Sequence, residues 1–155
     1  MSSVSPSGRS LHRLVYFSRS LIRPAEFELQ VDAIIRRSID NNRKDNISGL
    51  LFCHDGWFLQ ALEGPAIAVQ TAFGRIGVDR RHEGVKVLGA GPVDQRLFRE
   101  WDMCARTLSM VDAEVARTLE RRGPFEPGKL SAASATRLLE TLRTVRADAS
   151  RRIVA

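Results

Sequence analysis

The chain has 155 residues, 43% of them hydrophobic, which fits one ordinary globular domain. Its formal net charge of +6 permits weak attraction to nucleic acid or acidic partners without specifying either. No apolar run approaches the roughly 20 residues of a membrane helix. The Ser-rich residues 1–10 lack the apolar core of a secretory signal and predict a disordered tail. The cysteines Cys53 and Cys104 have no metal-ligand spacing, so we expect a reduced, cytoplasmic protein without a metal site.

The first part of the chain alternates between strand and helix patterns. Residues 12–18 are rich in β-branched and aromatic side chains and predict a strand. After a short loop, Pro24 suits a first helical turn, and residues 25–41 carry apolar side chains at mostly helical spacing. The polar residues 41–46 then predict a break before the next strand.

A β-hairpin is the strongest local signal, because an Asp-Gly dipeptide separates the apolar runs 47–54 and 57–62. Gln60 interrupts the second run and shares its strand face with Phe58 and Leu62. The polar-out alternation of antiparallel sheets favours an exposed Gln60. A buried Gln60 would need hydrogen-bond partners for an amide that both donates and accepts.

The rest of the chain continues the alternation and ends in helices. The expected elements are a helix at 65–78, a charged connector at 79–84, strands at 85–91 and 96–107, and helices at 111–121 and 131–149. Ser131 is predicted to cap the last helix, which carries an apolar stripe of Leu138, Leu139, Leu142 and Val145.

The predicted order is β-α-β-β-α-β-β. Its first six elements match the ferredoxin-like arrangement, an α+β fold with two helices on one face of the sheet. The other face needs a cover, which a helical C-terminal extension on or near it can supply. We expect three parts: a disordered tail at 1–10, one compact domain at 11–108 and the extension at 109–149.

Several short motifs follow one another on these elements: LVYFS in the first strand, NN followed by ISGLL, then FLQALEGP, RIGVDRRHEG and FREWDM. In this order they resemble BLUF domains, the sensors of blue light using FAD. The resemblance covers residues 14–108. It implies that 11–108 is a flavin-binding domain with non-covalent FAD, and that the chain is a short photoreceptor rather than an enzyme.

The resemblance assigns the photoactive pair to Tyr16 and Gln60. Tyr16 corresponds to the donor of an electron and a proton to the excited flavin, and Gln60 to the amide whose hydrogen bonding light rearranges into a red-shifted state. Without the other motifs, Tyr16 would be interpreted as a core aromatic residue with a satisfied hydroxyl.

The resemblance also implies a set of flavin contacts: Tyr16, Ser38, Asn41, Asn42, Leu50, Phe58, Gln60, Ile76, Asp79 and Arg81, with Arg75 and His82 as further candidates. Asn42 would bond the polar edge of the ring, although Asn is also favoured at helix C-termini. Arg81, supported by Asp79, would reach a flavin carbonyl, although these residues are also typical of a solvated loop.

Trp101 and Met103 resemble a Trp-x-Met motif associated with passing the signal outward, and ordinary sheet packing explains them equally well. The interval from Tyr16 to Asn42 is about two residues longer than the family pattern. We expect the extra residues in the loop at 20–24, because surface loops tolerate insertions. The alternative is a shifted first helix, which would put Ser38 and Asn42 in doubt.

We expect the signal to be read out as a change in protein–protein association. The chain is expected to form a homo-oligomer, a dimer at least, and to act on a separate downstream protein. Two other functions fit the order of elements. A flavin-free, basic ferredoxin-like module would bind nucleic acid in a salt-dependent manner, but we do not expect direct nucleic-acid binding here. A hydrolase of the acylphosphatase type would need a glycine near the first strand for phosphate binding, and LVYFSRSLIRP has none.

Overall fold

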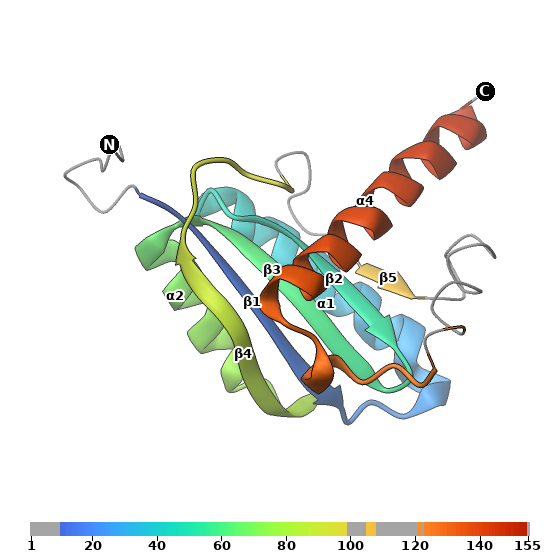
Figure 1. The fold of residues 1–155 in the computed structure, drawn as a ribbon. Helices are drawn as coiled ribbons and strands as arrows, with labels where there is room; N and C mark the ends of the chain where they lie inside the picture. The colour runs from blue at the N-terminus through green and yellow to red at the C-terminus, as the bar shows by residue number, and fades with distance from the viewer. Residues whose placement is uncertain (1–9, 99–104, 108–120, 122, 155) are drawn as a thin grey trace.

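The computed structural model describes residues 10–98, 105–107, 121 and 123–154, with the backbone alone for residues 39, 105–107 and 144–154 (Figure 1). The elements are β1 Leu11–Ser20, the 3₁₀-helix η1 Pro24–Glu26, α1 Phe27–Lys44, β2 Ser48–His54, β3 Trp57–Pro65, α2 Ala66–Gly77, β4 His82–Pro92, β5 Ala105–Thr107, the 3₁₀-helix η3 Pro127–Lys129 and α4 Ala132–Val154. Among the described residues, no helix has the length and apolar character needed to cross a membrane.

The five strands lie in the order β4-β1-β3-β2-β5. β1 pairs antiparallel with β3 and β4, β2 pairs antiparallel with β3, and β5 joins parallel to β2. The β1-α1-β2 and β3-α2-β4 units each cross over one intervening strand, as in ferredoxin-like folds. The predicted ferredoxin-like α+β topology is therefore confirmed.

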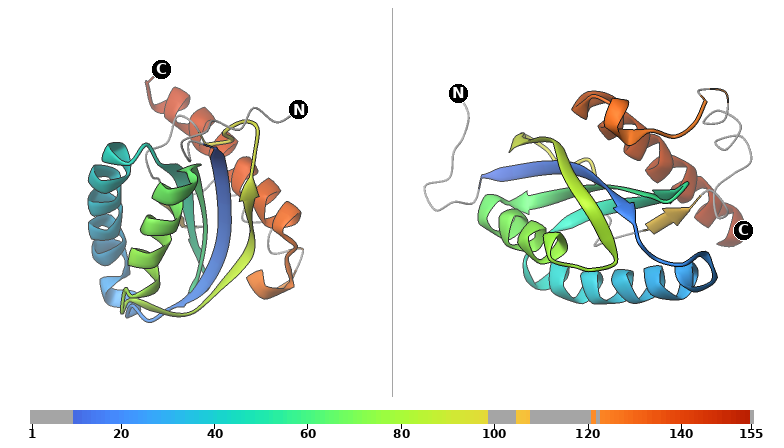
Figure 2. Two further views of the ribbon diagram at one scale, coloured as in Figure 1. Left: turned by 90° about the vertical axis from the view of Figure 1, so that its left-hand side faces the viewer. Right: turned by 90° about the horizontal axis from the view of Figure 1, so that it is seen from below.

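Helices cover both faces of this sheet (Figure 2). On one face, the strands share a hydrophobic cluster with Val31 of α1 and Val69 of α2. On the other face, Leu59 and its neighbours pack against Leu139 and Leu142 of α4. Because successive strand side chains enter two different cores, β2 and β3 have nearly continuous apolar sequences rather than alternating ones.

The turn between β2 and β3 fixes how these strands align. Asp55 and Gly56 both have positive φ angles, 52° and 78°, as a two-residue hairpin turn of type I′ requires. The resulting register places Leu51 opposite Gln60. Both side chains therefore lie on the face that α1 and α2 cover.

Several boundaries differ from the expected ones. α1 continues to Lys44, so Asn41 and Asn42 belong to the helix rather than to the expected polar break. The helix ends where Asn46 adopts φ 57°, a left-handed conformation that Asn tolerates. β4 begins at His82, inside the expected connector. Of the expected strand 96–107, residues 96–98 form a loop, Ala105–Thr107 form β5, and 99–104 lie outside the described residues.

The last helix covers the second face of the sheet. Its predicted cap is confirmed, because Ser131 Oγ accepts a hydrogen bond from the Ser134 backbone N–H at 3.1 Å. α4 continues beyond the expected end, to Val154. Since α4 buries this face, the sheet by itself supplies no burial argument for a dimer. The helix expected at 111–121 lies outside the described residues except for residue 121, as do residues 1–9 of the tail.

Candidate functional site

A cavity of about 490 Å³ lies between the sheet and the helices α1 and α2. All but one of the residues expected to contact a cofactor line it: Tyr16, Ser38, Asn41, Asn42, Phe58, Gln60, Ile76, Asp79 and Arg81. The further candidates Arg75 and His82 line it too. The topology thus gathers side chains from β1, β3, both helices and the connector after α2.

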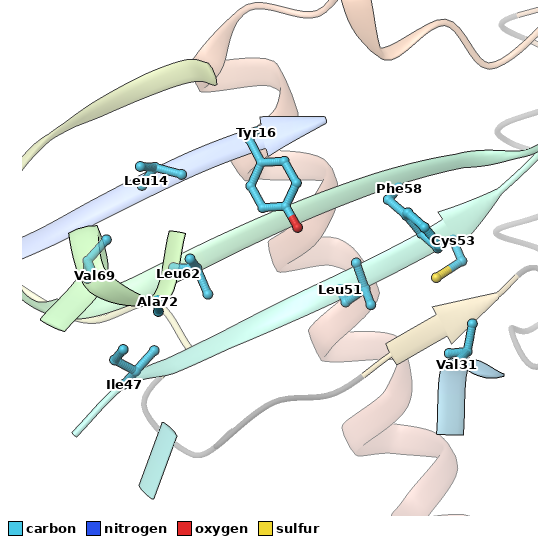
Figure 3. Close-up of a cluster of buried hydrophobic side chains, with 10 residues drawn as sticks. All are labelled: Leu14, Tyr16, Val31, Ile47, Leu51, Cys53, Phe58, Leu62, Val69 and Ala72. Atoms are coloured by element: carbon cyan, nitrogen blue, oxygen red, sulfur yellow. The ribbon is translucent and has the colours of Figure 1, made fainter. Parts of the chain in front are cut away.

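The floor of the cavity contains a hydrogen bond between two strands. Tyr16 of β1 lies opposite Gln60 of β3, and its hydroxyl donates to Gln60 Oε1. In Figure 3 the Tyr16 ring projects from β1 over β3, on the same side as Leu51 and Phe58. Tyr16 and Gln60 are 3% and 4% exposed. The prediction of an exposed Gln60, made from alternation alone, is wrong because the two helices cover this face.

The environment of Tyr16 keeps its hydroxyl protonated. Burial raises the pKa of Tyr16 above its ordinary value, with smaller contributions in the same direction from Cys53 and Asp79. The ring packs edge-on against Phe73, with 5.4 Å between centroids. Tyr16 is therefore a rigid, neutral hydrogen-bond donor at physiological pH.

The end of α1 supplies the polar wall. Asn41 and Asn42 lie three and four residues after Ser38, which places the three side chains toward one side of the helix. Asn42 is 4% exposed, and its backbone carbonyl accepts the Ile47 N–H at 2.9 Å. All three polar residues line the cavity from the C-terminal half of α1.

The connector after α2 contributes a charged pair. Arg81 Nε donates to both carboxylate oxygens of Asp79, at 2.9 and 3.1 Å, and the Arg81 backbone N–H donates to Asp79 Oδ1 at 2.9 Å. The hydrogen bonds from the Arg81 side chain lower the pKa of Asp79, and the same contacts raise the pKa of Arg81. Both side chains are partly buried, so Asp79 orients a permanently charged guanidinium at the cavity wall.

His82 has protein partners at both ring nitrogens. Its Nε2 lies 2.6 Å from the Ile76 carbonyl, which can only accept, so Nε2 carries a proton. Its Nδ1 lies 2.7 Å from Ser18 Oγ. His82 therefore links β1 to the C-terminal end of α2. The other further candidate, Arg75, has a partner as well, since its guanidinium lies 3.3 Å from Asp45 Oδ2.

One expected contact, Leu50, is wrong. Leu50 belongs to the cluster under α4, on the opposite face of the sheet from the cavity. Leu51 lines the cavity instead, because it is the residue that pairs with Gln60. A two-residue turn at Asp55-Gly56 fixes which residues of β2 and β3 lie opposite each other. Counting outward from that turn pairs Leu51 with Gln60, so this count would have identified Leu51 from the sequence. Trp101 and Met103 lie outside the described residues.

These groups fit the ring of a flavin. The buried amide of Gln60 and the polar side chains of Asn42 and Arg81 supply hydrogen-bond donors and acceptors, while Phe58 and Ile76 supply apolar surface. A mostly apolar cavity with a few convergent polar groups is typical of cofactor sites. The donor set suits an aromatic ring system that carries carbonyl oxygens and ring nitrogens along one edge.

Comparison with known proteins decides the family. Residues 11–104 match the family model described as BLUF, "Sensors of blue-light using FAD". The chain belongs to the BLUF family. Membership makes this BLUF domain a flavin-dependent blue-light sensor module, and it favours that function over the flavin-free nucleic-acid module.

Relatives and solved structures agree with this assignment. The chain is 35% identical over 111 residues to the photoactivated adenylate cyclase subunit beta of Euglena gracilis, a match that covers 70% of this chain and 13% of that protein. The structure titled "BlsA photo-activated state" superposes with a TM-score of 0.75 at 25% identity, covering 85% of this chain and 94% of that one. Klebsiella pneumoniae BlrP1 with FMN and cyclic diGMP gives a TM-score of 0.62 at 26% identity, covering 91% and 36%.

Proposed function

We propose that this BLUF domain senses blue light through the hydrogen bond between Tyr16 and Gln60. The observation that carries the proposal is this buried bond in the floor of a cavity that fits a flavin. A bound flavin supplies blue absorption and redox chemistry that the protein side chains lack. The chain's own residues then bind and orient the flavin and change their hydrogen bonds after illumination.

Three groups of residues would hold the cofactor. Asn42, with its neighbour Asn41 and with Ser38 one turn earlier on α1, would bond its polar edge. Arg81, oriented by Asp79, would donate to a ring carbonyl. Phe58 and Ile76 would enclose the ring and exclude water.

Tyr16 is proposed as the photoactive donor of an electron and a proton to a bound, excited flavin, and both return to Tyr16 by the end of the cycle. Its raised pKa keeps the hydroxyl protonated in the dark, so the proton resides on Tyr16 and points at Gln60 Oε1. Because the pair is buried, water does not compete for this proton. The proton on the Tyr16 hydroxyl thus has a defined acceptor before illumination.

Gln60 is proposed as the group that retains the signal. Its amide presents a carbonyl oxygen on one side and an NH₂ group on the other, and rearrangement of the amide exchanges them. Glu lacks the amide donor and Leu lacks any polar atom, so neither residue replaces it. Packing around the pair separates the two arrangements and makes them a bistable element.

FAD is the proposed cofactor, bound non-covalently. The family description names FAD, whereas the BlrP1 structure is described with FMN. Titration of flavin-free protein with FAD, FMN and riboflavin measures which flavin binds most tightly. Equal affinity for all three would contradict a specific preference for FAD.

For the output, we propose that illumination loosens or moves residues 109–149, and that this changes association with a second copy or a separate protein. In this proposal the domain acts as a cytoplasmic receptor and has no enzymatic activity of its own. Support comes from α4, which docks on the sheet through a short apolar stripe that includes Leu139 and Leu142, because an isolated helix of this length is only marginally stable in water.

The deciding experiment is the absorption spectrum of purified protein supplied with flavin, before and after blue light. We expect a yellow protein whose flavin band shifts to the red and recovers in the dark. Tyr16→Phe and Gln60→Leu should keep bound flavin and lose the shift, because each removes one member of the pair. A normal shift in either variant would falsify the assignment, and well-folded protein that binds no flavin would refute the function itself.

A further inference from the structure

A buried carboxylate lies on the side of β3 that faces away from the cavity. Glu63 follows Gln60 by three residues, so the two side chains point to opposite faces of the sheet. The Glu63 side chain is fully excluded from solvent. A buried charge is costly unless it is paired and hydrogen-bonded, so the partners of Glu63 define what it holds.

Glu63 binds β1 and one short loop. Arg13 Nε donates to Glu63 Oε2 at 2.8 Å, which neutralises the charge. The Leu97 backbone N–H lies 3.0 Å from both carboxylate oxygens, and the Phe98 N–H donates to Oε1 at 2.7 Å. Glu63 therefore fastens residues 97–98 to the strand that carries Gln60.

Arg96 strengthens this attachment on the sheet side. Its guanidinium donates to Ser48 Oγ at 2.7 Å, to the Asn46 carbonyl at 2.7 Å and to the Glu63 carbonyl at 3.2 Å. Each contact lies next to the start of β2 or the end of β3. Residues 96–98 are consequently held at three successive positions by one end of the sheet.

The same loop is bound by α4 on its other side. Arg143 donates a hydrogen bond at 2.6 Å to the Leu97 carbonyl, the same peptide segment whose N–H groups Glu63 holds. The Phe98 side chain is fully buried in the cluster that contains Leu139 and Leu142. α4 lies across this face of the sheet, as Figure 1 shows. Residues 96–98 thus form a hydrogen-bonded connection between β3 and α4.

We propose that Glu63 is a positioning residue that couples β3, the strand that carries Gln60, to α4, and that the light signal crosses the sheet through Glu63, Leu97 and Arg143. The inference rests on the proposed function of Gln60 and adds the route by which its rearrangement reaches the helix. Hydrogen bonds of 2.6–3.0 Å weaken steeply when stretched, so a displacement of β3 at Glu63 must move the loop or break its bonds.

The test compares Arg143→Leu with Arg137→Leu, measured by hydrogen exchange of residues 132–143 in dark and light. Arg137 is an exposed residue on the same helix, so the control makes the same change in charge and side chain. Arg143→Leu should raise dark exchange of this helix by about tenfold and abolish the light-induced change, while the flavin red shift stays complete. Arg137→Leu should retain the wild-type light-induced change.

A merely structural role predicts a different result: faster dark exchange in Arg143→Leu, with the light-to-dark ratio unchanged. That result would overturn the coupling. So would a wild-type protein whose red shift is complete while the hydrogen-exchange rates of α4 are the same in dark and light. Absence of the red shift in the wild type refutes the proposed function instead, so the two failures are distinguishable.

Glu63→Gln provides a second variant that keeps side-chain shape. Its one carbonyl oxygen can face the loop N–H groups, which leaves an NH₂ group against Arg13, or it can face Arg13, which leaves an NH₂ group against the Phe98 N–H. We expect a complete red shift and a light-induced α4 response at least about threefold smaller than in the wild type. Loss of the red shift in this variant would mean that Glu63 acts on the cavity, and an undiminished α4 response would exclude the route through Glu63.

Discussion

Replacing Tyr16 by Phe removes one buried hydroxyl and keeps the ring, whose contact with Phe73 persists. A net hydrogen bond contributes about 1 kcal/mol, and a buried acceptor that loses its donor costs about 1–3 kcal/mol. Both Tyr16 and Gln60 are nearly excluded from solvent, so water does not replace the donor. We expect the free energy of unfolding to fall by about 1–2 kcal/mol, and Tm by roughly 3–6 °C for a chain of this size.

A double-mutant cycle with Gln60→Leu assigns this loss to the pair. If the Tyr16 hydroxyl bonds Gln60, the two substitutions should couple by about 1 kcal/mol. The assay is urea unfolding in the dark at one saturating flavin concentration, because ligand binding also raises stability. Coupling below about 0.3 kcal/mol, the usual error of additivity, would refute the hydrogen bond as the dark arrangement.

Ser18→Ala is the matched control for this cycle. Ser18 lies two residues after Tyr16 on β1, is fully buried, and has a hydroxyl that bonds His82 rather than Gln60. Its removal should destabilise the protein by a similar amount but add independently to Gln60→Leu. Equal coupling of both hydroxyl deletions to Gln60→Leu would show a general loosening of β1 instead of a specific bond.

Four other outcomes are expected. Asn42→Ala should weaken flavin binding about tenfold in a titration, through the lost amide, and unchanged affinity would favour a shifted α1. The ion pair of Asp79 with Arg81 should stabilise the folded protein fully above the ordinary Asp pKa of about 4, and this stability should be lost as pH falls below that value, because folding lowers the pKa of Asp79. Urea unfolding at a series of pH values measures the effect, and Arg81→Gln should abolish it. Gly49→Ala should cost more than about 2 kcal/mol in the same assay, since its Cβ would lie 2.1 Å from the Ala61 carbonyl oxygen. Light scattering at micromolar concentration tests the oligomer expected from the sequence, which should give at least a dimer mass; because α4 already buries the second face of the sheet, a monomer would reject that expectation.

Local sequence chemistry was sufficient for the order of the elements and for the hairpin of β2 and β3, whose turn also holds the register that the choice of Leu50 overlooked. An Asp-Gly pair with both φ angles positive is a two-residue turn, so β2 and β3 align without any tertiary information. The order of strands and helices specified the ferredoxin-like sheet, because crossover connections have few allowed topologies. The motifs around Tyr16 and Gln60 then identified the family. Helix ends were less accurate, since Asn41 and Asn42 suit both a helix and a break.

Burial and long-range pairing were decided by the tertiary structure alone. Gln60 is polar within an apolar strand, and only the packing of α1 and α2 determines that it is buried against Tyr16. Glu63 has no local sign of its role, because its partners lie about fifty residues before it and about thirty-five after it. A local pattern reports the face on which a side chain lies. The segments that fold over that face determine whether the side chain meets water, a hydrogen-bond partner or a cofactor.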